Sequence, residues 1–472
     1  MSRTRSASIV RWFAWALVFA SPYMATHGFT QDTRTVKEPV IPPSCVTLKA
    51  TFTNAIAVSG GVEARAVKAG SDTAGLDTGR IQQAIDGCGK GKAVELAADG
   101  ANAAFVSGPL ALRPGVTLVI DKGVTLFGSR NPETYAVSPG SCGVVNDQAR
   151  GCNPLILAKN ATGSGIMGDG VIDGQGGTYL MVDGKASSKT WWDLAEEARA
   201  AGRQQVPRLI ETDVTDDFTL YRITLKNSAN FHVAFHRGDG FTVWGVKINT
   251  PKNARNTDGI DPAQSKNVTI TQSYISTGDD NVAIKAGDGP TTNVSITHNH
   301  FYYGHGMSIG SETNGGVSAI RVEDLSLDGP DNAIRIKSNP TRGGLVEDVV
   351  YDDVCIRNSK NPILLDTAYS FPGKGVNELP VYQNITLRNV RIAGGGKIQF
   401  NGFDKTHRIG VQLDGVMLMD GADHYRSQAI HTDVTFGPGP VNLVLTGDDS
   451  TSKGKEVSGK LPGCATKFVP FP

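Results

Sequence analysis

The sequence predicts an all-β fold, a parallel β-helix (solenoid) whose short strands follow one continuous spiral of stacked coils. Strand-like runs of alternating residues recur at intervals of 23 to 36 residues, with 26 the commonest spacing. Glycine, asparagine and aspartate separate the runs, as expected at tight turns. A repeat of this length is typical of a solenoid, whereas a β-sandwich or barrel, the alternative, does not repeat at a steady interval. The eight clearest runs begin at Phe218, Phe241, Val268, Val294, Ile320, Val349, Ile385 and Val411.

Two helices are expected outside the repeat. Residues 78–87 begin with Thr78 as a cap and place Ile81, Ala84 and Ile85 on one face, which predicts a short amphipathic helix. We expect it to cover the open N-terminal end of the coils, where bare strand edges would otherwise promote aggregation. A second helix is predicted from Trp191 to Arg203, on an insertion.

The first 28 residues have the pattern of a secretory signal peptide. Three arginines precede an apolar run from Trp12 to Ala20, and small and turn-prone residues follow up to Gly28. The run is too short for a membrane span, so cleavage near Gly28 is expected, with a retained N-terminal anchor as the alternative. The predicted mature protein, residues 29–472, is then a single extracellular β-helix domain, and its tail after Ser450 should wrap the last coil or fray.

Composition excludes several classes of protein. The chain has 472 residues, of which 39% are apolar, and its 46 basic residues balance 46 acidic ones. This apolar share argues against disorder and against a polytopic membrane protein. With no net positive charge, neither a nucleic acid nor an anionic membrane is an expected partner, so an anionic substrate must be bound by a local group of cations.

Six cysteines in an exported chain predict disulfides. In chain order they form an early, a close and a late pair, although six cysteines allow fifteen pairings and the sequence does not choose among them. Only a short loop separates the third and fourth cysteines, so a disulfide between these two is the safest prediction. The three pairs are Cys45 with Cys88, Cys142 with Cys152, and Cys355 with Cys464.

Aligning the coils by their first strands brings several polar residues to one outer surface. Asp279 and His305 each lie eleven residues into their coil, directly after Gly278 and Gly304. Coils stack at about 4.8 Å, so the two side chains should be neighbours. Asp280 has the opposite parity along the strand, and it reaches the same surface only if the chain turns sharply at Gly278.

Strand alternation extends this surface into neighbouring coils. Lys285, Arg335 and Lys337 lie at outward-facing offsets, while their neighbours at alternate positions are aliphatic and point inward. If the preceding coil is allowed five extra residues, the alignment places Asp258 beside Asp280.

Three carboxylates this close will not all ionise independently, so one of them should have a raised pKa and remain protonated near neutral pH. A protonated carboxyl beside ionised ones is the arrangement that glycoside hydrolysis uses. Two other readings remain open at this point. Asparagine and aspartate form hydrogen-bonded ladders in solenoid turns, and clustered oxygens also bind calcium, which the neighbouring cations disfavour.

Four motifs resemble those of the polygalacturonases, glycoside hydrolase family 28. They are Asn256-Thr257-Asp258, Gly278-Asp279-Asp280, Gly304-His305-Gly306 and Arg335-Ile336-Lys337, in the family's order. The longer segments ARNTDGIDP, STGDDNVAIKAG and GHGMSIGSET are similar to those of secreted endo-polygalacturonases of plant-pathogenic bacteria. The resemblance runs from about Cys45 to Gly421 and implies a right-handed parallel β-helix.

The resemblance also implies a role for each motif residue. Asp279 is expected to be the general acid, Asp258 and Asp280 to hold and deprotonate the attacking water, and His305 to tune the acid. Asn256 is expected to contact substrate, and Arg335 and Lys337 to bind the galacturonate carboxylate at the cleavage site. Tyr369 matches a tyrosine of the family's substrate cleft. The register alone, without the family resemblance, predicts that Lys285 is a flanking substrate contact.

The expected activity is therefore hydrolysis of α-1,4 bonds in de-esterified homogalacturonan, with inversion and without a metal or organic cofactor, by a secreted monomer. Exo-cleavage by the same chemistry is the alternative. A calcium-dependent pectate lyase and a non-catalytic polysaccharide-binding solenoid are more distant alternatives.

Other polar residues are expected to lie at turns. Asp261 is interpreted as a turn residue rather than a fourth catalyst. The acidic run that starts at Glu211 is interpreted as a solvated turn, with calcium binding as its alternative. Asparagines of Asn-x-Ser/Thr triplets are interpreted as turn residues rather than glycan acceptors, namely Asn160, Asn267, Asn293 and Asn384.

Overall fold

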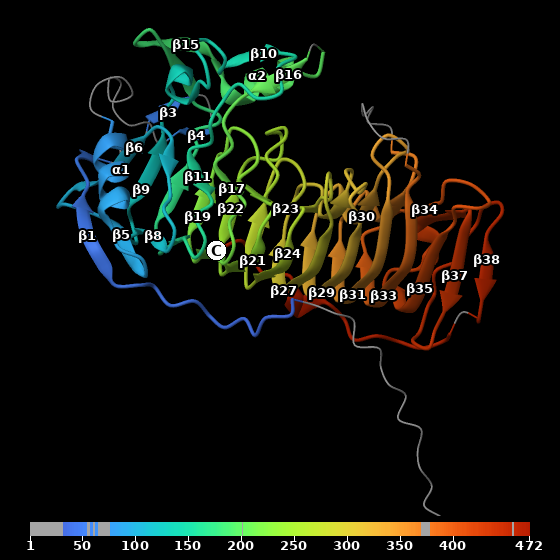
Figure 1. Cartoon of the computed structure of the whole chain (residues 1–472). Coiled ribbons are helices and arrows are strands. Elements are labelled where there is room, and N and C mark those ends of the chain that lie inside the picture. The colour runs from blue at the N-terminus through green and yellow to red at the C-terminus, as the bar shows by residue number, and fades with distance from the viewer. Residues whose placement is uncertain are drawn as a thin grey trace, which may run out of the picture.

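The chain forms a long stack of β-coils, seen from the side in Figure 1. The computed structural model describes residues 32–53, 57–59, 62–64, 76–200, 202–369, 378–455 and 457–472. The predicted signal peptide, residues 1–28, lies outside these described residues. No helix in the described ranges is long and apolar enough to cross a membrane.

Two extended sheets run the length of the stack. The smaller has eleven strands, each hydrogen-bonded to the strand of the next coil. Its strands are β7 (Leu110–Ala111), β11 (Ile156–Lys159), β17 (Ile210–Asp213), β20 (Val233–His236), β23 (Ile260–Ala263), β26 (Val282–Ile284), β28 (Met307–Gly310), β30 (Asn332–Lys337), β32 (Asn361–Asp366), β34 (Gly396–Asn401) and β36 (Tyr425–Ile430).

The larger sheet has 21 strands and bends around two sides of each coil. Its strands are β1 (Ser44–Lys49), β2 (Phe52–Thr53), β5 (Lys92–Ala97), β6 (Asn102–Ser107), β8 (Val116–Ile120), β9 (Thr125–Gly128), β12 (Gly165–Met167), β13 (Val171–Asp173), β18 (Phe218–Tyr221), β19 (Thr224–Lys226), β21 (Asp239–Trp244), β22 (Lys247–Asn249), β24 (Lys266–Thr271), β25 (Tyr274–Ser276), β27 (Thr291–Phe301), β29 (Val317–Asp328), β31 (Leu345–Arg357), β33 (Val381–Ala393), β35 (Ile409–Leu418), β37 (Thr432–Phe436) and β38 (Thr451–Lys453).

The predicted register of the coils is confirmed. The eight residues at which we placed the strand starts pair one after another along the larger sheet, from Phe218 with Phe241 through to Ile385 with Val411. Just before this row the chain takes the left-handed conformation in the coils from Asp217 to Asn384, and Asn267, Asn293 and Asn384 have φ of 55°, 59° and 52°. Asparagine tolerates this region better than most residues. These three asparagines nevertheless lie within β24, β27 and β33 rather than at the turns that we expected.

Inward-facing side chains fill the spiral. Ile260, Val282, Met307, Ile334 and Ile363 pair in succession along the smaller sheet, and all are fully buried. Such a column removes apolar surface from water in every coil, and burial of one large aliphatic side chain contributes about 1.5–3 kcal/mol. Because alternate residues point outward, the same pairing fixes which side chains line the outer surface.

Helix α1 (Thr78–Gly87) has the predicted limits and buries Ile81 and Ile85. The predicted threonine cap is wrong. Asp77 precedes the helix without a side-chain cap bond, and its carboxylate accepts from the Val106 amide at 2.8 Å. Thr78 Oγ1 accepts from the Gly108 amide at 2.8 Å, so both side chains bind the helix to the first coils. Figure 1 shows the helix beside these coils.

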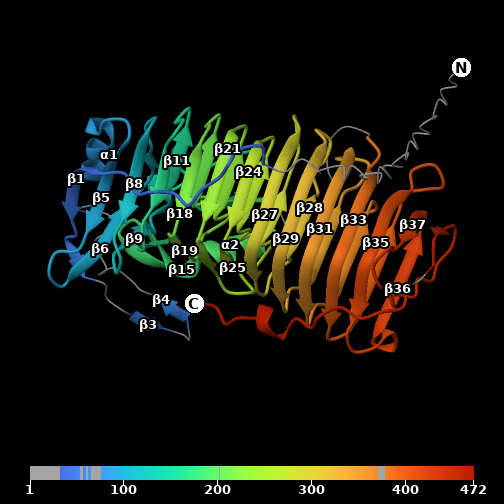
Figure 2. The same ribbon diagram turned by 90° about the horizontal axis from the view of Figure 1, so that it is seen from below.

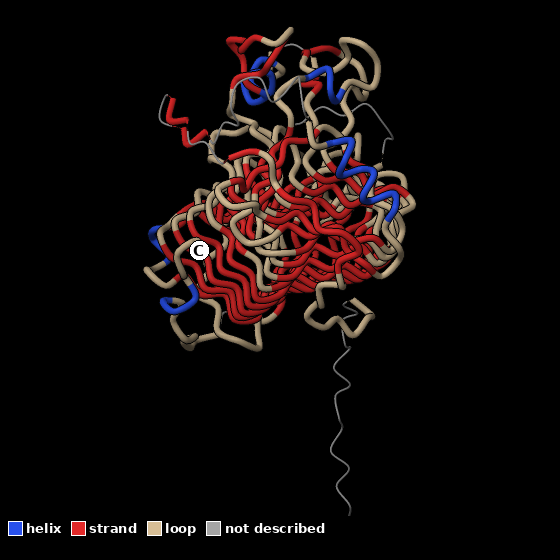
Figure 3. The backbone as a smooth tube through the Cα atoms, turned by 90° about the vertical axis from the view of Figure 1, so that its left-hand side faces the viewer, coloured by secondary structure: helices blue, strands red, loops and turns tan. Residues whose placement is uncertain are grey.

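Insertions from the N-terminal coils project to one side of the stack (Figure 3). They contain the hairpin β14 (Tyr179–Val182) and β15 (Lys185–Thr190), helix α2 (Trp191–Glu197), and β10 (Val144–Asn146) paired with β16 (Arg203–Gln205). The predicted second helix is shorter than expected, because the chain leaves the helix after Glu197 and enters β16 at Arg203. The remaining short elements are β3 (Ala57–Ser59), β4 (Val62–Ala64), η1 (Pro132–Tyr135), η2 (Ala422–His424) and η3 (Ala465–Lys467).

Three disulfides join the cysteines as the chain-order pairs predict, Cys45–Cys88, Cys142–Cys152 and Cys355–Cys464. The last of them shows that the C-terminal tail does more than wrap the last coil. After β38 the tail runs back along the strands toward the middle of the stack (Figure 2), where Val469 accepts a hydrogen bond from Tyr302.

Candidate active site

Two rows of outward side chains run along the smaller sheet and carry most of the polar residues that we predicted. The strands β17, β20, β23, β26, β28 and β30 present equivalent positions to this surface. The first row holds Glu211, Ala234, Asp261, Ala283, Ser308 and Arg335. The second row holds Asp213, His236, Ala263, Lys285, Gly310 and Lys337. The predicted outward positions of Lys285, Arg335 and Lys337 are confirmed.

The turn before β26 supplies two of the three predicted carboxylates. Gly278 makes this turn possible by close approach, since a Cβ there would lie 1.9 Å from the Ala254 carbonyl oxygen of the preceding coil. Asp279 follows, and its Oδ1 accepts from the Asp280 amide at 2.9 Å. The two side chains therefore have different partners. Asp279 contacts His305, and Asp280 contacts side chains of β28 and β30.

Asp280 is 2% exposed, and each of its oxygens contacts a cation or a hydroxyl. Lys337 Nζ lies 2.7 Å from one oxygen, and Arg335 Nη1 lies 3.4 Å from the other. Ser308 Oγ donates to the same oxygen as Arg335, at 2.7 Å. Burial acts to raise the pKa of Asp280, but the charges of Lys337 and Arg335 outweigh it and hold the pKa below the ordinary value. Asp280 is therefore ionised.

Asp279 and His305 form a second charged pair. His305 Nδ1 donates to Asp279 Oδ1 at 3.0 Å. Burial would raise the pKa of Asp279, but this hydrogen bond and the charges of His305 and Lys337 lower it. For His305 burial acts in the opposite sense, and the hydrogen bond and charge of Asp279 raise its pKa above the ordinary value. In the free protein the transferable proton of this pair therefore resides on the imidazole.

The predicted carboxyl with a raised pKa is Asp258, which precedes β23. Burial, together with the negative charges of Asp279 and Asp261, raises its pKa well above the ordinary value. Lys285 Nζ lies 3.7 Å from its Oδ2, and within the described residues its buried Oδ1 has no hydrogen-bond partner. The raised pKa thus falls on Asp258 rather than on Asp279.

Asp261 and Lys285 lie differently from our expectations. Asp261 is not at a turn: it lies within β23, 1% exposed, and Lys285 Nζ is 2.7 Å from its Oδ2. Burial raises the pKa of Asp261 to about 6 against the lowering effect of Lys285. The Lys285 side chain is only 19% exposed, and its ammonium lies 4.3 Å from the centre of the Phe231 ring. Its position favours a counter-ion for buried carboxylates over a flanking substrate contact.

The remaining predicted residues lie at the edges of this cluster. The Tyr369 ring centre is 5.4 Å from the Arg335 guanidinium and 5.5 Å from the Lys337 ammonium. Asn256 is half-buried and takes the left-handed conformation, with φ of 56°, two residues before Asp258. The structure therefore gathers the catalytic and binding candidates on consecutive coils.

Comparison with known proteins identifies the family. The model of glycosyl hydrolases family 28 matches residues 88–436. The chain belongs to this family. It is 46% identical over 394 residues to an endo-polygalacturonase of Pectobacterium carotovorum subsp. carotovorum, covering 83% of this chain and 90% of that protein. A polygalacturonase of Ralstonia nicotianae is 40% identical over 518 aligned positions, covering 97% and 96% of the two chains.

A solved structure gives the same result for the fold. The polygalacturonase from Erwinia carotovora ssp. carotovora superposes with a TM-score of 0.71 and 41% sequence identity, covering 91% of this chain and all of that one. The resemblance to the polygalacturonase family that the four motifs carried is therefore confirmed, as is the parallel β-helix. This protein is a glycoside hydrolase.

One group of side chains in this family 28 enzyme has a spacing that a metal ion could use. The possible ligand atoms of Asp279, Asp280 and His305 lie within 4.8 Å of one another. Their chemistry fits a metal poorly. Both oxygens of Asp280 are already neutralised by Lys337 and Arg335, and His305 Nδ1 carries a proton toward Asp279. A cation would have to displace these charges, so catalysis without a metal stays our prediction.

Two site residues were missed by the sequence analysis. Ser308 donates to Asp280, and the register could have found it, because it occupies the outward position between Ala283 and Arg335. Phe231 has no such signal, since it lies outside the strands and meets Lys285 only through folding.

The His305–Asp279 pair gives a direct titration test. In an Asp279→Asn variant, the pKa of His305 should fall, because burial still disfavours the imidazolium while the negative charge that offset it is gone. NMR titration of the histidine ring protons measures this. His300, whose Nδ1 lies 2.7 Å from Ser326 Oγ on another sheet, is the internal control and should titrate as in the wild type. An unchanged or raised His305 pKa would contradict the pairing.

Proposed function

We propose that this enzyme is a secreted endo-polygalacturonase that hydrolyses α-1,4 bonds in de-esterified homogalacturonan with inversion. The observation that carries the proposal is the ionised Asp280, fixed between Lys337 and Arg335, beside a proton-bearing Asp279–His305 pair. The endo-polygalacturonase from Pectobacterium, 46% identical, supports the same activity.

Asp279 acts as the general acid in this proposal, with His305 as its proton reservoir. Lys337 is one of the charges that lower the pKa of Asp279 in the free enzyme. When a galacturonate carboxylate binds, its negative charge offsets the positive charge of Lys337. The pKa of Asp279 then rises, and the proton passes along the 3.0 Å hydrogen bond from His305 to Asp279, which protonates the glycosidic oxygen.

Asp280 and Asp258 handle the attacking water. Asp280 is ionised, so it can accept a proton from water as the sugar is attacked. Asp258 is buried and its pKa is raised, and its Oδ1, unpartnered among the described residues, is suited to orient the same water. Lys285, which contacts Asp261 and Asp258, limits the negative charge that accumulates around that water.

Substrate recognition rests on Arg335 and Lys337, with Tyr369 and Asn256 at the edges. The two cations are needed because the chain as a whole carries no positive field. Within the described part of the chain, the buried Nε of Arg335 has no hydrogen-bond partner, so this group can donate to a galacturonate carboxylate.

Three further features belong to the proposal. Residues 1–28 are a signal peptide removed on export, because charged, apolar and small residues follow in that order. Residues 29–472 form a single catalytic domain. The enzyme acts as an extracellular monomer on plant cell-wall pectin, without an organic cofactor.

The mode of cleavage is tested by following product sizes over time on polygalacturonate. Two relatives are named endo-polygalacturonases, that is, enzymes that cut within the polymer. Random internal cleavage should give a ladder of oligogalacturonates early in the reaction. Monomers or dimers alone from the first time points would mean exo-cleavage. Ultraviolet absorbance of an unsaturated sugar would mean a lyase, and absence of new reducing ends would leave only binding.

The acid role of Asp279 predicts a specific kinetic loss. Asp279→Asn should lower kcat on polygalacturonate by about 10³-fold, within the range that general acid catalysis supplies. On an oligogalacturonide with a nitrophenol leaving group, which leaves without protonation, the loss should be much smaller. Asp280→Asn is the matched control and should not be rescued by the better leaving group. Equal losses on both substrates would remove Asp279 from this role.

Inversion predicts the configuration of the first product. A water held by Asp258 and Asp280 attacks from the face opposite the departing oxygen, so an α-linked substrate should give a β-configured reducing end. Proton NMR of oligogalacturonate digests, recorded before mutarotation, measures this. An α product, or a trapped glycosyl ester on Asp258 or Asp280, would instead mean that a carboxylate attacks the sugar directly.

A further inference from the structure

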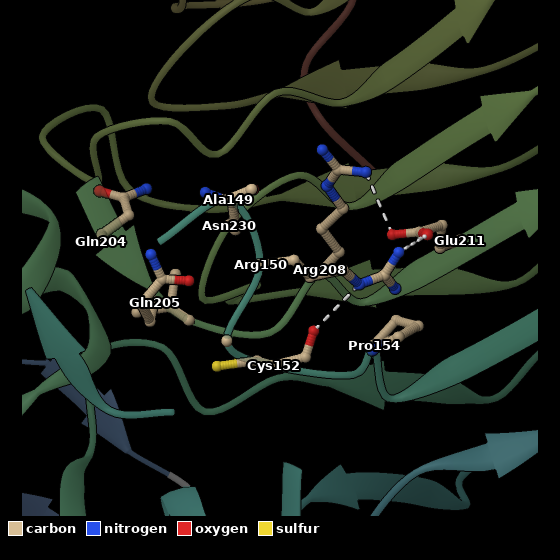
Figure 4. Close-up of a pocket in the computed structure, with 11 residues that line it drawn as sticks. Ala149, Arg150, Cys152, Pro154, Gln204, Gln205, Arg208, Glu211 and Asn230 are labelled. Carbon is tan, nitrogen blue, oxygen red and sulfur yellow. Dashed lines mark hydrogen bonds and ion pairs between the residues drawn. The ribbon is translucent and has the colours of Figure 1, made fainter. Parts of the chain in front are cut away.

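A half-enclosed polar pocket of about 190 Å³ lies beside the N-terminal end of the candidate site. It forms where β16 and residues 149–154 of the insertions meet the coil of β17, as the close-up in Figure 4 shows. Neither the predicted motifs nor the proposed mechanism uses it. Its polar side chains are Arg150, Gln204, Gln205, Arg208, Glu211 and Asn230.

The pocket carries an excess positive charge. Glu211 is only 7% exposed, in β17 rather than at the solvated turn that we expected, and it pairs with Arg150 at 2.8 Å and with Arg208 at 3.1 Å. One carboxylate thus faces two guanidinium groups. Burial lowers the pKa of the neighbouring His236 to about 4, so this ring is neutral, and its Nε2 accepts from Arg208 Nη1 at 3.1 Å.

The positive charge remains accessible. Arg150 keeps its side chain 50% exposed while one end of its guanidinium contacts Glu211. In Figure 4 the dashed lines run from the two guanidinium groups to Glu211 and from Arg150 to the Cys152 carbonyl. A planar guanidinium presents five donors, so an incoming carboxylate still finds N–H groups on Arg150.

The pocket also contains an acceptor without a donor. The side-chain oxygen of Gln204 is buried and has no hydrogen-bond partner in the described ranges of the chain. Its neighbour Gln205 is satisfied differently, because its Nε2 donates to the Gln148 carbonyl at 2.9 Å. A buried amide oxygen left unpaired costs free energy, and a hydroxyl donor from a bound molecule would satisfy it. The pocket therefore matches a ligand that has both a carboxylate and hydroxyl groups.

The pocket is aligned with the candidate catalytic residues. Glu211 belongs to the same outward row as Asp261, Ser308 and Arg335. Its strand β17 lies two coils before β23 and three before β26, or roughly 10–14 Å at the spacing of stacked strands. Phe231 connects the two regions, with its ring centre 5.0 Å from the Arg208 guanidinium and 4.3 Å from the Lys285 ammonium.

We propose that this pocket is a distal subsite that binds one galacturonate unit of the polymer, about three sugars from the bond that is cleaved. Arg150 and Arg208 bind its carboxylate and Gln204 accepts from one of its hydroxyls. An extended 1,4-linked chain advances by close to one sugar per coil, so a polymer lying across the outward rows reaches the pocket. This inference rests on the proposed polygalacturonase function and adds the part of the substrate that lies beyond the catalytic coils.

Chain length provides the test. Arg150→Gln should lower the ratio of kcat/KM for octagalacturonate to kcat/KM for trigalacturonate by about fivefold, the effect of one partly exposed charge-assisted contact. Arg150→Lys should retain most of the ratio, and Arg150→Glu should lower it further. The control is Arg222→Gln, which removes an exposed arginine paired with Asp169, both between strands of the larger sheet, and should leave the ratio unchanged.

Binding supplies a second measurement that does not need turnover. In an Asp279→Asn background, calorimetry should give a Kd for octagalacturonate about fivefold weaker when Gln204→Ala or Arg150→Gln is added. The Kd for trigalacturonate should change much less. If the Arg150 variants fold poorly, the Gln204→Ala variant still tests the subsite.

Each other outcome has a separate meaning. Equal losses on short and long oligomers, or no loss on either, would overturn the distal subsite while leaving the proposed function intact. A wild-type enzyme that releases no reducing ends from polygalacturonate would instead overturn the proposed function. A gain in octagalacturonate affinity for Arg150→Glu would also contradict the subsite, since it would show that the pocket repels carboxylates.

Discussion

The in-register stacking of parallel coils is the constraint on which the rest of the structure depends. Each coil repeats the backbone of the previous one at about 4.8 Å, so residues at equivalent positions become neighbours whatever their separation in sequence. Inward positions form aliphatic columns such as Ile260, Val282 and Met307. Outward positions form the rows that hold Ser308 beside Arg335. The register that buries the core therefore also assembles the site.

This assembly concentrates charge in a place with little water, and the pairing of that charge determines the chemistry. Asp280 remains ionised because Lys337 and Arg335 offset the cost of its burial. Burial raises the pKa of Asp258 and of Asp261, and the charge of Lys285 lowers each pKa only in part. Neighbouring carboxylates thus differ in pKa, and the proton for the acid step is held on His305 beside Asp279 rather than on Asp279 itself.

Sequence periodicity was sufficient wherever a residue's position depended on the register alone. The eight strand starts, helix α1 and the outward placement of Arg335 and Lys337 were all predictable. Predictions for polar residues between these positions were less successful. Asp261 and Glu211 were expected at turns, because aspartate and glutamate are usually solvated, but both lie in buried strand positions opposite cations.

The sequence by itself determined the spacing of the coils, the side of each strand that faces the core, and the motif residues that share the outer surface. These follow from local alternation and from a repeat that every coil obeys. Only the tertiary structure decided the pairing of charges, such as Lys285 with Asp261 and the insertion's Arg150 with Glu211. It also decided that the raised pKa belongs to Asp258 rather than Asp279. Electrostatic energies depend on distances of a few ångströms and on burial, and neither quantity is encoded in sequence spacing.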